Sequence, residues 1–117
     1  MPPLYDKTKE PGIQAALDEL ACGWPDVTTG KMFGSRAYRA KGVLFAMIGG
    51  EGVILTKLQP AEREIAARES RARVFVGHGK EIPAWIEFPL QDATGVAAMA
   101  SMVRLAYENA LAEANGS

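Results

Sequence analysis

Residues 31–58 read KMFGSRAYRAKGVLFAMIGGEGVILTKL, and the rest of the expected fold is arranged around them. It contains three runs typical of β-strands, separated by Lys41-Gly42 and by the Gly-Glu-Gly triplet at 50–52. Glycine accepts the positive φ that tight hairpins require, so the pattern predicts an antiparallel meander. The middle run, Val43–Ile48, is apolar at every position, whereas a strand with one wet face would alternate. We therefore expect a central strand that is covered on both faces.

Helices are expected on either side of the meander. Pro11 suits a first helical turn, and apolar residues then recur at helical spacing until Gly23. Asp92 suits the N-cap of a longer last helix, whose apolar residues recur over about four turns. A short charged helix begins at Gln59-Pro60, between the third and fourth strands.

The expected fold is therefore α+β: a mainly antiparallel five-stranded sheet with the N- and C-terminal helices packed on it. The fourth and fifth strands are expected at 72–76 and 84–88, and Gly34 is expected to form a bulge in the first. Residues 1–117 are interpreted as a single domain, with 1–10 as a loose lead-in. The expected core comprises Phe33, Phe45, Ile48, Leu55, Ile86, Phe88, Met99 and Val103.

Composition favours a soluble cytoplasmic protein. Apolar residues make up 48% and charged residues 23%, as in globular domains, and no segment is long and apolar enough to span a bilayer. The start of the chain lacks the pattern of a signal peptide. Cys22 is the only cysteine, which excludes an internal disulfide, and its place in the first helix favours a small core residue over a nucleophile.

Charge is distributed unevenly although the net charge is only −1. Residues 1–30 carry −3, residues 31–80 carry +6 and residues 81–117 carry −4. The favoured interpretation is internal complementarity between acidic helices and a basic sheet. The alternative is a basic face for an anionic partner.

Together these runs resemble the N-terminal domain of the TfoX (Sxy) competence regulators, over roughly residues 30–111. The YjbR-like family is a related second choice. Two departures stand out: Ser35 replaces a glycine that often follows Met-Phe-Gly in the TfoX pattern, and the full-length regulators carry a second domain. The resemblance is carried by Met32-Phe33-Gly34, Val43–Ile48, Leu55-Thr56-Lys57, Trp85–Pro89 and the expected C-terminal helix.

The resemblance implies helices on an antiparallel sheet and a bacterial role in the transcriptional control of competence through a protein partner. We therefore expect a non-catalytic binding or regulatory domain; no catalytic triad or phosphate-binding glycine motif argues for an enzyme. A homodimer is a further expectation, because a second chain would help to cover Val43–Ile48.

Two groups of polar residues are candidate sites. His78 lies between two glycines, and with Lys80 and Lys57 it is a candidate site for a small anion or other ligand; the alternative is a plain hairpin loop. One histidine and one cysteine do not make a metal site, and no cofactor is expected. The candidate nucleic-acid residues are Lys31, Arg36, Arg39 and Lys41. Alternating strand faces would divide them, so direct DNA binding is expected to be weak or absent.

Overall fold

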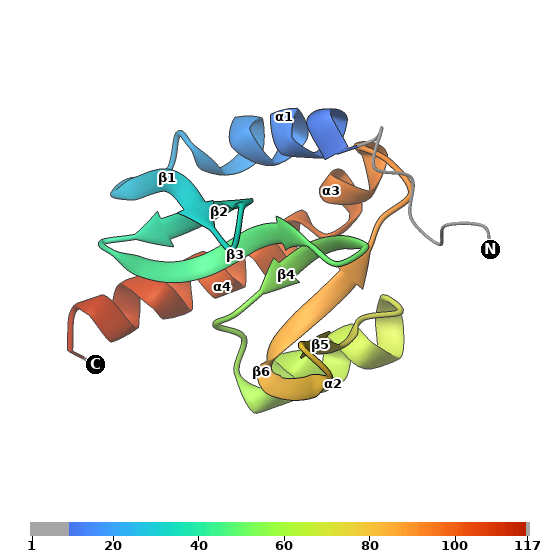
Figure 1. Ribbon diagram of the computed structural model, residues 1–117. Helices are drawn as coiled ribbons and strands as arrows, with labels where there is room; N and C mark the ends of the chain where they lie inside the picture. Colours follow the sequence, from blue (N-terminus) through green and yellow to red (C-terminus); the bar gives the residue numbers. More distant parts are fainter. Residues whose placement is uncertain (1–9, 117) are drawn as a thin grey trace.

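The computed structural model describes residues 10–116 as an α+β fold, an antiparallel sheet of six strands with four helices (Figure 1). The predicted α+β class and antiparallel sheet are confirmed, whereas the predicted count of five strands is wrong. Along the chain the elements are α1 (Glu10–Ala21), β1 (Val27–Met32), β2 (Ser35–Ala40), β3 (Val43–Gly49), β4 (Gly52–Leu55), α2 (Pro60–Glu69), β5 (Arg73–Gly77), β6 (Lys80–Pro89), α3 (Thr94–Ala98) and α4 (Ala100–Ala114).

The strand order is β1-β2-β3-β4-β6-β5, and every neighbouring pair is antiparallel. The first four strands form a meander. The chain then passes through α2, places β5 at the outer edge and returns through β6, which pairs with β4. The edges of the sheet are therefore β1 and β5. Figure 1 shows α1 above β1 and β2, with α4 passing behind β3 and β4.

The additional strand arises at Phe33 and Gly34. Both residues have positive φ (53° and 78°), and they join β1 to β2 as a two-residue hairpin turn flanked by the pair Met32 and Ser35. Residues 31–40 are therefore not one strand, and Gly34 is not a bulge. Phe33 stands at the tip of the hairpin and is 78% exposed, so its prediction as a core residue is wrong. A phenylalanine rarely adopts a positive φ, which is why the sequence did not indicate this turn.

The structure also differs from the sequence predictions at the last helix and at Cys22. The predicted last helix is divided at Met99 into α3 and α4. The N-cap of α3 is Ala93, so the prediction of Asp92 as the N-cap is wrong by one residue, although the Asp92 carboxylate accepts a hydrogen bond from the Thr94 N–H (3.0 Å). Cys22 is exposed, so its prediction as a core residue is wrong. The predicted lead-in lies mostly outside the described residues, and Glu10 already belongs to α1. Within residues 10–116 no helix is long and apolar enough to cross a membrane.

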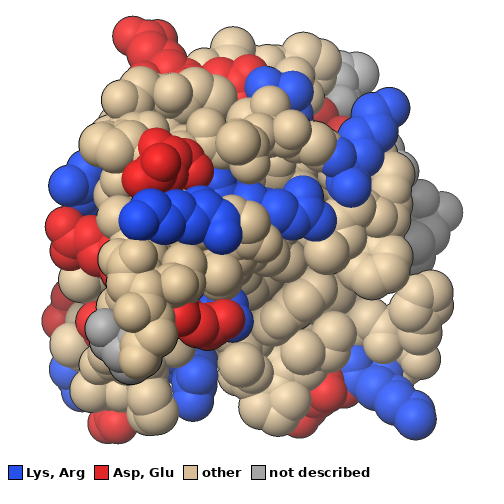
Figure 2. Space-filling view, turned by 90° about the vertical axis from the view of Figure 1, so that its left-hand side faces the viewer, with Lys and Arg blue, Asp and Glu red and all other residues tan. Residues whose placement is uncertain are grey.

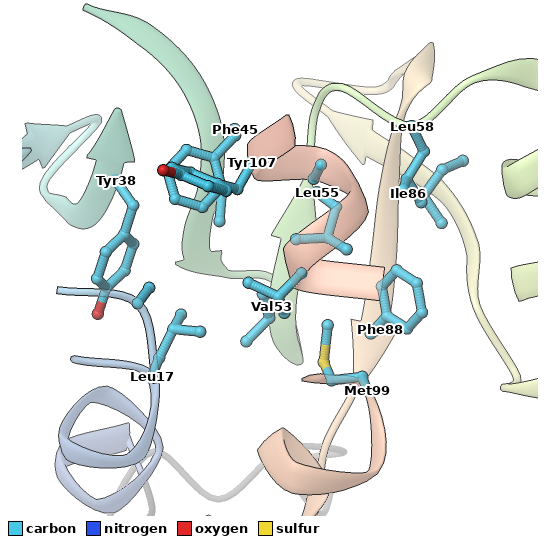
Figure 3. Close-up of a cluster of buried hydrophobic side chains, with 14 of the residues drawn as sticks. Leu17, Tyr38, Phe45, Val53, Leu55, Leu58, Ile86, Phe88, Met99 and Tyr107 are labelled. Carbon is cyan, nitrogen blue, oxygen red and sulfur yellow. The ribbon is translucent and has the colours of Figure 1, made fainter. Parts of the chain in front are cut away.

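The main core lies between the helices and one face of the sheet. A shift in the pairing of β2 with β3 leaves Phe45 without a partner between the pairs Tyr38–Ala46 and Arg39–Leu44. This bulge turns both Phe45 and Ala46 toward the helices, where both are fully buried. The rings of Phe45 and Tyr107 meet edge to face with centroids 5.7 Å apart, and Figure 3 shows them near Tyr38.

Asp18 fastens α1 to this face. Its carboxylate accepts hydrogen bonds from Nε and Nη2 of Arg36 (3.1 and 2.9 Å) and from the Tyr38 hydroxyl (2.5 Å). Burial, followed by the hydrogen bond to Asp18, raises the pKa of Tyr38. A two-pronged arginine–carboxylate pair fixes orientation as well as distance, so α1 is held in a defined position over β2.

Replacing Phe45 by alanine tests the core. Removal of a fully buried aromatic ring should lower the free energy of unfolding by about 3–5 kcal/mol. The matched control is Phe33→Ala, which removes the same ring from an exposed position and should change that free energy by no more than about 0.5 kcal/mol. Urea denaturation of the two variants measures both values. Equal losses would contradict the assignment of Phe45 to the core and Phe33 to the surface.

Candidate functional site

Within residues 10–116, no helix packs on the face of the sheet opposite the main core, and we call it the uncovered face. Ala37, Met47 and Ile54 are nevertheless buried there, in a second and smaller cluster. The residues that pack on them come from the sheet itself: Met32, Leu44, Phe75 and Trp85. The expectation that Val43–Ile48 is covered on both sides is thus met on this face by side chains of the sheet itself.

A bulge in β6 brings two of these side chains, Phe75 and Trp85, over the second cluster. Val74 pairs with Ile86, but the next residue of β5, Phe75, pairs with Ile82. Residues 83–85 of β6 therefore have no partner in β5, and Pro83 has no N–H to donate to a ladder. A bulge of this kind bends a strand and increases its twist. The rings of Phe75 and Trp85 then stack over the second cluster, with centroids 6.1 Å apart and planes 28° apart.

The bent hairpin leaves an open apolar hollow of ≈ 270 Å³ on the uncovered face, which we call the aromatic hollow. It lies between two hairpin turns, one at Phe33 and one at His78. Its lining also includes Gly49, Gly50 and Gly77, and because glycine has no side chain the walls are low there. Its apolar lining is formed by Phe33, Met47, Ile54, Phe75, Ile82 and Trp85. Such a lining favours an apolar group over a charged one.

A second hollow of ≈ 360 Å³ lies beside Trp85, which lines both. It contains Thr56 and Lys57, and the Lys57 ammonium forms an ion pair with Glu113 of α4 (Nζ to Oε1, 2.8 Å). Because that pair is partly exposed to solvent, it contributes little to stability. The two hollows share one lining residue, Trp85.

An ionic network fixes the β3–β4 turn that borders the aromatic hollow. The Glu87 side chain is only 8% exposed, and its carboxylate accepts from the Glu51 N–H (2.6 Å) and from Nε of Arg73 (3.3 Å). Arg73 also donates from Nη2 to Oε1 of Glu51 (2.9 Å). Hydrogen bonds to Glu87 and then Glu51 raise the pKa of Arg73. The network ties the turn, β5 and β6 together, so the walls of the hollow have a fixed spacing.

The predicted ligand residues are distributed around these hollows. His78 and Gly79 both have positive φ (53° and 76°) and form a two-residue turn between Gly77 and Lys80. His78 lines the aromatic hollow, Lys80 is exposed beside it, and Lys57 lines the other hollow. Lys57 and His78 therefore do not converge on one hollow. Small-anion binding at His78 stays a prediction.

The predicted nucleic-acid residues do not form one surface. Arg36 is bound to Asp18 on the helix side, while Arg39 lies opposite Leu44 on the uncovered face. Lys41 donates to the side chain of Asn115 (3.0 Å), and Lys31 is exposed. Figure 2 shows a short band of basic side chains on one side of the molecule, with acidic side chains above and below it. Weak or absent DNA binding stays a prediction.

Of the residues that line the aromatic hollow, the sequence predicts only His78 as part of a site. The sequence predicts Trp85 within the fifth strand and Phe33 within the core. The only available signal was the unbroken apolar run Val43–Ile48, which demands a second cover but does not say which residues supply it. Within the part of the chain that the structure describes, no group of three or more His, Cys, Asp or Glu side chains could hold a metal ion.

Comparison with known proteins adds no relative: no family model matches the chain, and neither a curated protein nor a solved structure matches it significantly.

Replacing Gly50 by alanine tests how the hollow's border is held. A Cβ at Gly50 would overlap the Glu87 carboxylate, which cannot move without breaking its bonds to Glu51 and Arg73. The control is Gly42→Ala, which has a similar positive φ (85° against 56°) but open space around the new methyl group. Backbone strain should cost either variant about 1–2 kcal/mol.

Gly50→Ala should lose a further ~1–3 kcal/mol of unfolding free energy, because it leaves buried polar groups without partners. Urea denaturation of both variants gives the difference. If the two variants were equally stable, Glu87 would not be the group that fixes the turn.

Proposed function

We propose that this chain is a non-catalytic binding module that acts in the bacterial cytoplasm through a protein partner, in a role similar to that of the N-terminal domain of the TfoX competence regulators. The partner would place an apolar side chain in the aromatic hollow. One observation carries the proposal: an open apolar hollow on the uncovered face, with Phe33 exposed at its rim.

The size and lining of the hollow favour a side chain over a metabolite. Sites for small molecules usually measure about 300–1,000 Å³ and hold several polar groups in fixed positions. The aromatic hollow is smaller (≈ 270 Å³), and its floor is formed by the side chains of Met47, Ile54 and Trp85. Exposed aromatic residues beside an apolar depression are typical of the centre of a protein interface.

The proposed regulatory role rests on the resemblance to the N-terminal domain of the TfoX regulators. Two of the segments that carry it, Met32-Phe33-Gly34 and Trp85–Pro89, supply Phe33 and Trp85 to the aromatic hollow. The proposed role in transcription control is therefore through a partner and not through direct contact with DNA. The predicted homodimer would use the same face, with Phe33 of each copy placed in the hollow of the other.

Photo-crosslinking in the native cell tests the proposal. A benzophenone side chain introduced at position 33 should crosslink to one discrete protein, identified by mass spectrometry. The matched control carries the same group in place of Ala112, which is exposed on α4, and should not crosslink to that protein. The Ile82→Ala variant, which removes a wall of the hollow, should reduce the crosslink formed from position 33.

Equal crosslinking from both positions, or none from position 33, would contradict the proposal. A crosslinked product with twice the mass of the chain would identify the partner as a second copy. Thermal melts of every variant would show that each one is folded.

A further inference from the structure

The edge strand β5 borders the aromatic hollow. β5 pairs with β6 on one side, and within residues 10–116 no strand lies on its other side. Two residues of β5, Phe75 and Gly77, line the hollow. The other edge strand, β1, contributes no residue to that lining. An unpaired edge offers a row of backbone donors and acceptors to a further strand.

The register of the hairpin identifies which backbone groups are available. Gly77 and Lys80 flank a two-residue turn and therefore form a hydrogen-bonded pair. Because such pairs alternate along an antiparallel ladder, the next residue, Val76, points its N–H and C=O away from β6. Its side chain is 54% exposed. A strand that paired with Val76 would place alternate side chains on the uncovered face, beside Phe75 and Gly77.

On the uncovered face the charge beside this edge is positive, whereas Glu81, which pairs with Val76, is exposed on the other face. Lys80 pairs with Gly77 and lies on the same face, and it forms no ion pair or hydrogen bond with another residue in the range 10–116. The nearest basic residue of β5 on this face, Arg73, is already bound by Glu51 and Glu87. Among the described residues, the Lys80 ammonium is thus the unpaired charge that a segment lying along β5 would meet on the uncovered face.

We infer that the partner of this module binds as an extended peptide segment that adds to the outer edge of β5. It places an apolar side chain in the aromatic hollow and an acidic side chain two residues away, opposite Lys80. This inference rests on the proposed function and specifies its partner: backbone hydrogen bonds to Val76 supply affinity, and the hollow and Lys80 supply selectivity.

A library of random ten-residue peptides displayed on phage tests the inference with a defined probe. Selection on the immobilised wild-type chain should enrich peptides with an apolar and an acidic residue two positions apart. Synthetic versions of these peptides are then titrated against three variants. Val76→Pro removes the outward N–H without affecting the ladder to β6, whereas Val76→Ala removes only the side chain. Lys80→Glu reverses the charge.

We expect Val76→Pro and Lys80→Glu each to weaken peptide binding at least about tenfold, and Val76→Ala to change it by less than about twofold. Melting curves check that the variants are folded. Enriched peptides that bind Val76→Pro as tightly as wild type, or that show a helical three–four spacing, would overturn the inference.

No enrichment at all would also overturn it. A different result would contradict the proposed function, namely the absence of any crosslink from position 33 in the cell. Crosslinking that persists without peptide enrichment would indicate a folded partner surface in place of an extended segment.

Discussion

Strands β3 and β4 are apolar on both faces, but the helices cover only one of them. Leaving Met47 and Ile54 in water on the second face would forfeit much of their burial energy, about 1.5–3 kcal/mol for each side chain. The fold meets this constraint with the bulge at residues 83–85, which carries Phe75 and Trp85 over the second face. That cover is incomplete, and the space it leaves is the aromatic hollow. The candidate site is thus a consequence of how the second face is buried.

Each face is fixed by its own polar network. On the helix side, Asp18 joins α1 to β2, while on the uncovered face Glu87 joins the β3–β4 turn to β5 and β6. Removing one partner from such a network leaves buried groups unsatisfied, so both arrangements resist local distortion. A hollow with walls held in this way is prepared for a partner before binding, which reduces the entropy that association costs.

How much the sequence could predict depends on whether a feature is local. The α+β class, the antiparallel sheet and the cover on both faces of Val43–Ile48 follow from spacing and composition and are present, although the last helix is divided at Met99. The sixth strand could not be predicted, because it depends on Phe33 adopting a positive φ that its residue type disfavours. The hollow could not be predicted either. Only the register of β5 against β6 places Trp85 and Phe75 together.

We propose that the uncovered face accepts an apolar group beside Trp85. The chain has two tryptophans, and Trp24 packs against Tyr107 elsewhere, so 5-fluorotryptophan labelling gives an internal control. Fluorine NMR spectra are recorded while indole, a stand-in for an apolar side chain, is titrated into the labelled protein; a Trp24→Phe variant assigns the two resonances. We expect a saturable shift of the Trp85 resonance with no change at Trp24. A shift at Trp24 alone, or equal small shifts at both, would contradict it.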